Sequence, residues 1–318
     1  MTQIEKYLEQ IEDASANGAL KSFDFLTGFG GSKLLGCLQR LVKVAPADTV
    51  YCEIGVFQGL SLVSVSAENP EVPCYGVDNF AFFDAEGQNK NIVLERKEKA
   101  KADNLHLIDE DYEDALENFD KHSGGKKMGV YFIDGPHDYR SQLMCLQLAL
   151  PHLAKGAVIL IDDSNYAHVR QANRDFVKTH PEFKLLFETY TDKHPTNMTE
   201  EEEAEARNGF WDGLNIIVHD PNDELPYAEP PTVRSRKKYE NEHEVHSARF
   251  ADLSWLAVSA VSHLRPFSPR LFTVEALRIL KRVITRPSED LEKYRILNQF
   301  AEGLETRLIR PKSAQGDD

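Results

Sequence analysis

The chain has 318 residues, 37 basic and 52 acidic side chains, and a formal net charge of −15. This length suffices for one large α/β domain with a smaller appendage, or for two modest domains. The negative charge argues against broad attraction to nucleic acid or anionic membrane, so we expect neither as a partner. No apolar run approaches the roughly 18 residues that cross a bilayer, and a charged N-terminal segment favours a cytoplasmic protein. The four cysteines lie in apolar sequence without a CxxC pair, which disfavours a disulfide or a zinc site.

The first 45 residues predict a helical N-terminal cap, which is interrupted at residues 27–31 by the sequence TGFGG. Its glycines supply flexible backbone, so this segment is either a plain turn or a lid that folds over a bound ligand. From residue 46 to 220, short apolar runs alternate with helical stretches, which predicts an α/β domain with a Rossmann-like, doubly wound, mostly parallel sheet of seven strands. The strands are expected near residues 49–55, 73–78, 105–108, 129–134, 157–162, 183–189 and 213–219. The polar connection 191–209 is a second candidate lid, in which Thr199 and Glu202 predict a helix capping box.

The composition changes after residue 220. Four prolines followed by the basic run RSRKK predict a linker at residues 221–235. Residues 236–318 predict a helical C-terminal extension, with one helix over 239–264 and a last helix after 287–288. The last helix would carry on one face Leu291, Tyr294, Leu297, Leu304 and Leu308. Such apolar stripes have to be buried on the main domain or on a second copy of the chain, so we expect a homo-oligomer through these helices as one solution.

Two of the expected strands stop abruptly in acidic residues. They are the runs GVYFIDGPHDY at 129–139 and AVILIDDSN at 157–165. Continuous apolar runs are typical of buried parallel strands, and sites in α/β proteins lie at the carboxyl ends of such strands. If the two strands are neighbours, one crevice collects Asp134, His137, Asp162 and Asp163. Three carboxylates and an imidazole suit a hard divalent cation beside a general base, which predicts an enzyme.

The first strand ends in a glycine-containing turn, EIGVFQG at 53–59, that opens into a helix. A dinucleotide fold requires G-x-G-x-x-G here, because a pyrophosphate has to approach bare backbone at the helix N-terminus. Glu53 stands in the position of the first glycine and would repel a phosphate, which disfavours a nicotinamide-dependent dehydrogenase. A cationic ligand would be attracted instead, and E-x-G-x-x-x-G is found where the amino group and the sulfonium of S-adenosylmethionine bind. The alternative is a loose glycine turn of another α/β protein; the residues expected to bind the cofactor here are Glu53, Gly55, Phe57, Gly59 and Ser61.

Acidic residues also follow the second and third expected strands. Asp78 comes 25 positions after Glu53, where a carboxylate can accept hydrogen bonds from both ribose hydroxyls; its alternative role is a helix N-cap. At the end of the third strand, Asp111 or a backbone amide could meet the adenine edge. Asp78 and Asp111 are therefore predicted to contact the adenosine part of S-adenosylmethionine.

Five ordered segments carry a resemblance to a known family: EIGVFQG, YGVDNF, LHLIDEDYEDAL, YFIDGPHDY and LPHLAKGAVILIDD. Taken jointly, they resemble the class I S-adenosylmethionine-dependent methyltransferases. The resemblance is greatest to the macrocin-type O-methyltransferases and relatives that act on sugars of natural products, and it covers about residues 50–220. Residues 235–318 match no part of the common pattern, so the substrate is not carried over.

For the metal and the base, the resemblance implies specific residues. A Mg²⁺ or similar ion would be held by Asp134, Asp162 and Asp163, unless Asp163 only caps the next turn and Asp162 only bonds backbone. His137 falls where some of these enzymes place a histidine that removes the hydroxyl proton, whereas others carry an acid one position earlier, where this chain has a proline. A plain loop histidine is the alternative, and His168 is a second candidate base.

The sequence therefore predicts an S-adenosylmethionine-dependent, Mg²⁺-assisted O-methyltransferase acting on a hydroxylated small molecule such as a sugar or a glycoside. The alternative is a non-catalytic S-adenosylmethionine-binding module whose helical C-terminus mediates assembly. The carboxylate cluster disfavours this alternative, because a fold without catalysis has no need of mutually repelling carboxylates. Phe210 and Trp211 either wall the acceptor pocket or pack in the core.

Overall fold

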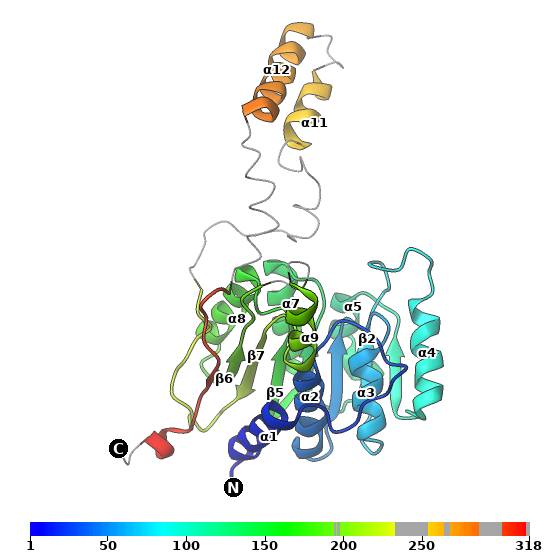
Figure 1. Cartoon of the computed structure of the whole chain (residues 1–318), viewed down its shortest axis with the longest axis vertical. Helices are drawn as coiled ribbons and strands as arrows, with labels where there is room; N and C mark the ends of the chain where they lie inside the picture. The colour runs from blue at the N-terminus through cyan, green and yellow to red at the C-terminus, as the bar shows by residue number, and fades with distance from the viewer. Residues whose placement is uncertain (194, 196–197, 233–253, 264–267, 286–300, 316–318) are drawn as a thin grey trace. The chain divides into compact units, whose positions relative to one another are not determined.

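The computed structural model describes residues 1–193, 195, 198–232, 254–263, 268–285 and 301–315. These residues fall into two compact units, one within 1–238 and 299–318 and the other within 239–298. The first unit holds the sheet and the candidate site (Figure 1). In the second unit, helix α11 (Ser254–Ser262) packs against helix α12 (Pro269–Thr285).

A single mixed sheet forms the centre of the first unit. Its strands are β1 (Val50–Ile54), β2 (Cys74–Val77), β3 (Leu105–Ile108), β4 (Met128–Ile133), β5 (Leu153–Ile161), β6 (Phe183–Thr189), β7 (Leu214–His219) and β8 (Arg307–Leu308). Their order across the sheet is β3-β2-β1-β4-β5-β7-β6-β8. The neighbours among β1 to β5 are parallel, whereas β7 runs antiparallel to both β5 and β6. The Rossmann-like α/β arrangement and all seven expected strands are confirmed.

The eighth strand corrects two expectations: the count of seven strands, and the helical end of the C-terminal extension. Leu308 pairs with Phe187 of β6 in antiparallel register, and the N–H of Ile309 donates to the carbonyl oxygen of Leu186 at 2.8 Å. Arg307 forms an ion pair with the fully buried carboxylate of Glu188. These contacts with a distant strand override the helical spacing of leucines on which the expectation rested. The earlier part of that expected helix, residues 291–297, lies outside the described residues.

Helices precede, connect and follow the strands of the first unit. They are α1 (Gln3–Asn17), α2 (Ser32–Val44), α3 (Leu60–Glu68), α4 (Asn89–Ala100), α5 (Tyr112–Glu117), α6 (Phe119–Ser123), α7 (Tyr139–Ala149), α8 (Ala167–Thr179) and α9 (Glu200–Asn208), with short 3₁₀ turns η1 (Leu150–His152) and η4 (Lys312–Gln315). The expected capping box at Thr199 and Glu202 is present and starts α9. The same device, formed by Thr2 and Glu5, starts α1.

Alternating side chains of the strands form two hydrophobic cores, one on each face of the sheet. In β4, Val130 and Phe132 belong to the core that contains residues of α1, α2 and α3. Tyr131 and Ile133 belong to the core that contains residues of α5 to α8. This alternation, with helices over both faces, is the expected doubly wound architecture.

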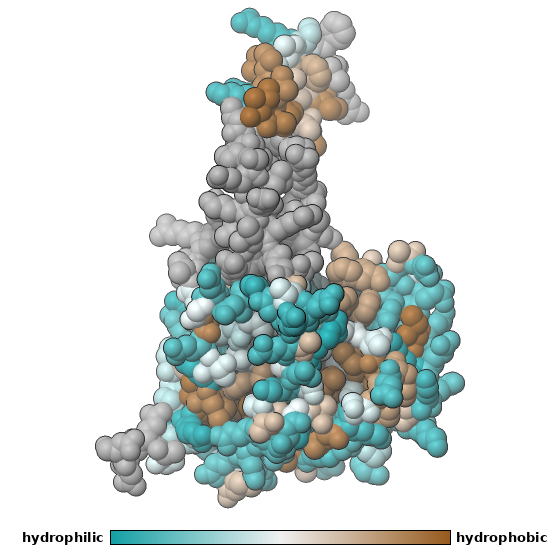
Figure 2. Space-filling view, in the orientation of Figure 1, coloured by the Kyte–Doolittle hydropathy of each residue, from teal (hydrophilic) through white to brown (hydrophobic). Residues whose placement is uncertain are grey.

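Helices α11 and α12 carry apolar side chains that remain exposed, and Figure 2 shows apolar surface on this unit. The apolar side chains that are more than half exposed are Val258, Val261, Leu271, Leu277, Leu280 and Ile284. The helix expected over residues 239–264 is described only as α11. Among the helices that the structure describes, none is long and apolar enough to cross a membrane.

Candidate cofactor and cation site

The candidate site lies where β1 and β4 are neighbours at the centre of the sheet. From β1 the chain adds β2 and β3 on one side of the sheet and then β4 and β5 on the other. Ligands of open α/β sheets bind at the carboxyl ends of the strands where the order changes side in this way. The N–H of Asp134, just after β4, donates to the carbonyl oxygen of Ile54 at 2.9 Å. A Cβ atom on Gly55, just after β1, would lie 1.8 Å from the carbonyl oxygen of Asp134. Gly55, with φ +88°, is therefore required for the two strand ends to approach each other.

The glycine turn after β1 is held by the carboxylate of Asp78. Its Oδ2 accepts hydrogen bonds from the N–H groups of Val56 and Phe57 at 2.9 and 2.8 Å, and its Oδ1 accepts one from Phe80 at 2.7 Å. Phe57 has a left-handed φ of +49°, and Gly59 starts α3 with φ +78°. Asp78 thus fixes the loop at the end of its neighbouring strand. Oδ1 of Asp78 can accept one more hydrogen bond, for example from a ribose hydroxyl. Binding of the ribose stays a prediction.

Glu53 is fully buried beneath this turn. The hydroxyl of Tyr51 donates to its Oε2 at 2.5 Å, and the hydroxyl of Ser61 donates to its Oε1 at 3.1 Å. Burial, with a smaller contribution from the charge of Asp78, raises the pKa of Glu53 to about 8. A cationic group bound at the turn would favour the ionised form of this carboxyl.

Asp111, at the end of β3, is the N-cap residue of α5. Its Oδ1 accepts a hydrogen bond from the N–H of Glu113 at 2.9 Å. The side chain therefore has a structural role at the helix start, which satisfies one of the unpaired N–H groups there. Contact with adenine stays a prediction for this residue.

Asp134, His137 and Asp163 come together at the ends of β4 and β5. One ligand atom from each lies within 4.8 Å of the other two. The Nδ1 atom of His137 lies 3.0 Å from Oδ2 of Asp163. Asp162, which we expected as a metal ligand, is not in this group; it is more deeply buried, and its Oδ1 accepts a hydrogen bond from the N–H of Asp163. Among the predicted residues, the structure thus brings two aspartates and the histidine together, and places the third aspartate beneath them.

The acidic cluster formed by Asp134, Asp162 and Asp163 has a further member that the sequence did not predict, Asp212. This residue precedes β7, and because β7 is antiparallel to β5, its beginning lies at the carboxyl end of β5. The side chain of Asn165 donates to Oδ1 of Asp212 at 2.6 Å and to the hydroxyl of Thr191 at 2.5 Å. Asp212 could have been predicted only by knowing that β7 runs antiparallel to β5. No local pattern in the sequence shows the direction of a strand.

The carboxyl groups of the cluster lie close to one another and are largely shielded from water. Burial, and next the charge of a neighbouring aspartate, raise the pKa of Asp134, Asp162 and Asp212 well above the usual range. For His137, burial alone would lower the pKa, but the carboxylates of Asp163, Asp162 and Asp212 outweigh burial and raise it. The site therefore attracts positive charge, either as protons or as a bound cation.

Buried polar residues behind the cluster hold its loops in place. Arg170 donates from Nη1 to the carbonyl oxygen of Ser164 at 2.8 Å and from Nε to that of Pro231 at 3.0 Å. The ring of His137 stacks on Tyr166, with centroids 5.8 Å apart and planes at 9°. His168, the second candidate base, is buried and contacts the carbonyl oxygen of His137 through Nε2. His168 thus supports the loop of His137.

The candidate lid at residues 27–31 is held by Arg96 of α4. Arg96 donates from Nη1 to the carbonyl oxygen of Thr27 at 2.9 Å and from Nη2 to its hydroxyl at 2.8 Å. Phe210 packs against Phe187 of β6 with ring centroids 5.4 Å apart, as expected for core packing. Trp211 is only 7 % exposed, and its ring lies 6.4 Å from that of Phe29.

Residues 52–164 match the model of a family described as a methyltransferase domain. Over these residues the chain is similar to methyltransferase domains. The match begins within β1 and ends just after β5, so it includes the glycine turn and the acidic cluster except Asp212. The narrower resemblance to macrocin-type enzymes stays a prediction.

Three solved structures illustrate what the chain is similar to. One is an O-methyltransferase from Bacillus cereus in complex with SAH, with 18% identity, 68% of this chain and 90% of that chain covered, and a TM-score of 0.45. Another is the O-methyltransferase TomG from Streptomyces achromogenes, involved in tomaymycin synthesis, with 15% identity, coverages of 69% and 99%, and a TM-score of 0.47. A third is the calicheamicin methyltransferase CalS11, with 14% identity, coverages of 55% and 83%, and a TM-score of 0.40. A comparison with curated proteins gave no match.

Proposed function

We propose that this protein is an S-adenosylmethionine-dependent O-methyltransferase that methylates a hydroxyl group of a small molecule, with a divalent cation bound beside the acceptor. The observation that carries the proposal is the contact between Gly55 and the backbone of Asp134. This contact supports the proposal, because the glycine turn after β1 then lies next to the carboxylates that follow β4. Methyl transfer is an in-line displacement, which requires the donor and the nucleophile to be held together in this way.

The carboxylates of Asp134 and Asp163, beside His137, fit a divalent cation. They are hard oxygen ligands of the kind that Mg²⁺ and Mn²⁺ prefer. When bound, such an ion would lower the pKa of a coordinated hydroxyl and orient its oxygen. The excess of buried carboxylates around the site supports the same proposal.

His137 is the proposed proton acceptor. Its Nδ1 lies 3.0 Å from Oδ2 of Asp163, so that carboxylate can fix the tautomer that carries its proton on Nδ1. Nε2 is then the atom that takes the proton of the acceptor hydroxyl. The carboxylate also stabilises the imidazolium that forms, and a positioned general base of this kind contributes roughly 10²- to 10⁴-fold in rate.

The proposal is tested with three measurements on the whole chain: calorimetric binding of S-adenosylmethionine, formation of S-adenosylhomocysteine with hydroxylated acceptors, and the effect of EDTA. Asp134→Asn should lower turnover by at least about 100-fold and leave cofactor affinity within about threefold. Asp103→Asn, at an exposed aspartate after α4, is the matched control and should leave both unchanged.

The possible outcomes separate the parts of the proposal. Failure to bind S-adenosylmethionine would contradict the methyltransferase assignment itself. Turnover that is unaffected by EDTA would contradict the role of a cation and leave the remainder standing. Cofactor binding without S-adenosylhomocysteine formation across the acceptors would favour the alternative, a non-catalytic binding module.

A further inference from the structure

We infer that the acceptor carries a planar aromatic ring, and that Phe29 binds the face of this ring beside the cofactor turn. The inference rests on the proposed methyltransferase function and narrows the acceptor beyond a hydroxylated small molecule. It also replaces the expectation of a sugar or a glycoside with a more apolar class of acceptor.

A row of aromatic side chains runs from the cofactor turn toward the acidic cluster. The ring of Phe29 lies 5.5 Å from that of Phe57 in the glycine turn and 6.4 Å from that of Trp211. Trp211 directly precedes Asp212 of the acidic cluster. The row thus connects the two halves of the proposed reaction site.

The exposure of these rings differs in a way that points to a ligand. Trp211 is 7 % exposed, whereas Phe29 is 62 % exposed and Phe83 is 78 % exposed. Single exposed apolar side chains are common, but two exposed aromatic rings at one pocket form a patch of the kind that binds ligands. Two such residues at the mouth of one pocket therefore favour an apolar occupant.

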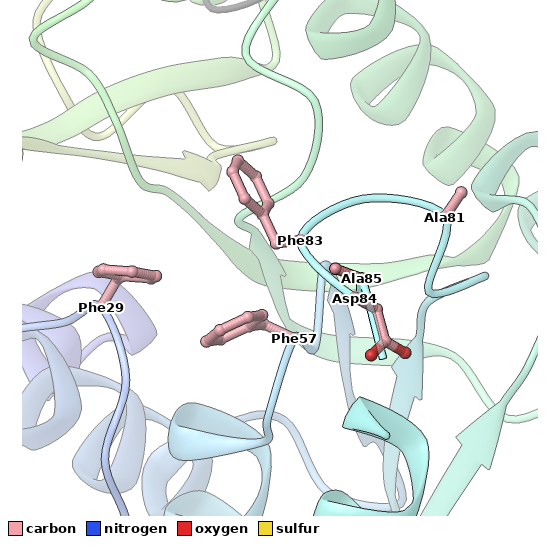
Figure 3. Close-up of a pocket in the computed structure, with 6 residues that line it drawn as sticks. All are labelled: Phe29, Phe57, Ala81, Phe83, Asp84 and Ala85. Atoms are coloured by element: carbon pink, nitrogen blue, oxygen red, sulfur yellow. The ribbon is translucent and has the colours of Figure 1, made fainter. Parts of the chain in front are cut away.

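The pocket that these rings line offers few polar partners. It has a volume of about 570 Å³ and is lined by Phe29, Phe57, Ala81, Phe83, Asp84 and Ala85 (Figure 3). Asp84 is the one polar side chain among these six residues, and in Figure 3 its carboxylate points away from the three rings. Its Oδ1 already accepts hydrogen bonds from the N–H groups of Gln88 and Asn89 at 2.7 and 3.2 Å.

This composition decides between a sugar and an aromatic ring. A sugar bound here would lose the hydration of several hydroxyl groups, and the lining side chains would not replace those hydrogen bonds. An aromatic ring buries apolar area and stacks on phenylalanine, with no polar groups left unpaired apart from those directed at the acidic cluster.

The loop that carries Phe29 is held in place. Arg207 donates from Nη1 to the carbonyl oxygen of Gly28 at 3.3 Å, and its guanidinium lies 4.6 Å from the centre of the Trp211 ring. A Cβ atom on Gly31 would lie 2.1 Å from the carbonyl oxygen of Gly209, so the loop packs closely on the end of α9. Phe29 is thus presented from a loop that is already ordered, which lowers the entropic cost of binding a ring there.

The test compares acceptors and variants on the whole chain. The probes are 4-methylcatechol, an aromatic diol, and methyl α-glucoside, a sugar with adjacent hydroxyls. Phe29→Ala should raise the KM for 4-methylcatechol by at least about tenfold and leave kcat within about threefold, because the ring acts through binding. Phe29→Trp should restore the KM to within about threefold of the wild type, since it restores the stacking face.

Phe82→Ala is the matched control, because Phe82 is 60 % exposed on the loop that carries Ala81 and Phe83 but is not among the residues that line the pocket. It should change neither KM nor cofactor affinity. Phe29→Ala should also leave the calorimetric affinity for S-adenosylmethionine unchanged, which separates the acceptor face from an adenine-binding face.

Several results would overturn the inference while the proposed function stands. They are preferential methylation of the glucoside, an unchanged KM in Phe29→Ala, weaker cofactor binding in that variant, or no binding of 4-methylcatechol to protein saturated with S-adenosylhomocysteine. A wild type that does not bind S-adenosylmethionine would contradict the proposed function, and the inference would fall with it.

Discussion

The buried carboxyl group of Glu53 offers a direct test of the electrostatics beneath the cofactor turn, through the substitution Glu53→Gln. The side chain is fully buried and accepts hydrogen bonds from the hydroxyls of Tyr51 and Ser61. Burial, with a smaller contribution from the charge of Asp78, raises its pKa from 4.5 to about 8. Since one pKa unit corresponds to about 1.4 kcal/mol, ionising Glu53 in the folded protein costs up to about 5 kcal/mol more than in the unfolded chain.

The sign of the pH dependence follows from the protons that each state binds. Between pH 4.5 and about 8, the folded protein keeps a proton on Glu53 that the unfolded chain has released. The contribution of this group to the free energy of unfolding is therefore fully present below pH 4.5 and is lost as the pH rises to about 8. Relative to Glu53→Gln, the free energy of unfolding of the wild type should fall by up to about 1.4 kcal/mol per pH unit within that window. Above the window it should fall little further.

Urea unfolding followed by circular dichroism, at intervals from about pH 5 to about pH 9, measures this difference in the free energy of unfolding. Glu71→Gln removes one exposed carboxylate in the connection between α3 and β2 and controls for the change in net charge. A difference between wild type and Glu53→Gln that stays constant from about pH 5 to about pH 8 would refute the reasoning, as would a difference with the opposite slope.

Three further predictions concern the sheet and the helical unit. Gly55→Ala should destabilise the fold by about 3 kcal/mol or more in urea unfolding, because its Cβ would clash with backbone; Gly124→Ala, also at positive φ but with nothing within 4 Å, should cost only about 1 kcal/mol. Arg307→Ala should cost about 2–4 kcal/mol by the same measurement, because it leaves the carboxylate of Glu188 buried without its ion pair; a smaller loss would show that β8 adds little. Leu280→Glu should shift any oligomer toward the monomer in light scattering after size-exclusion chromatography, since Leu280 is 53 % exposed on α12; an unchanged mass would argue against assembly through that face.

The parts of the site that the sequence could predict are those that follow parallel strands. Asp134 and Asp163 end buried apolar runs, and parallel strands carry their ends to one edge of a sheet, so the convergence of these residues follows from local pattern alone. Gly55 could be predicted because its turn precedes a helix at a fixed spacing. Asp78 also follows a strand, but the sequence does not show that its two carboxylate oxygens accept hydrogen bonds from backbone N–H groups. Those hydrogen bonds depend on the path of the turn after the neighbouring strand β1.

The parts that the sequence could not predict depend on strand direction and on distant pairing. Asp212 lies before its strand, and it reaches the cluster only because β7 is antiparallel to β5. The pairing of β8 with β6 joins residues more than a hundred positions apart in the sequence, and the spacing of leucines near Leu308 favours a helix when read locally. The aromatic row depends on the N-terminal loop reaching the end of α9, which again is a tertiary contact.

The contact between the turn after β1 and the loop after β4 fixes the position of one side of the site relative to the other. Asp134 is hydrogen-bonded to Ile54 through its backbone, and its carbonyl oxygen packs against Gly55, so its backbone cannot move relative to the turn without breaking the pairing of β1 with β4. In the proposed reaction the distance between methyl donor and acceptor oxygen is therefore set by the sheet, where a near-attack separation of about 3–3.5 Å can be maintained. Substitutions at the turn should then affect stability and rate together, whereas substitutions at Phe29, on a loop outside the sheet, should change the affinity for the acceptor alone.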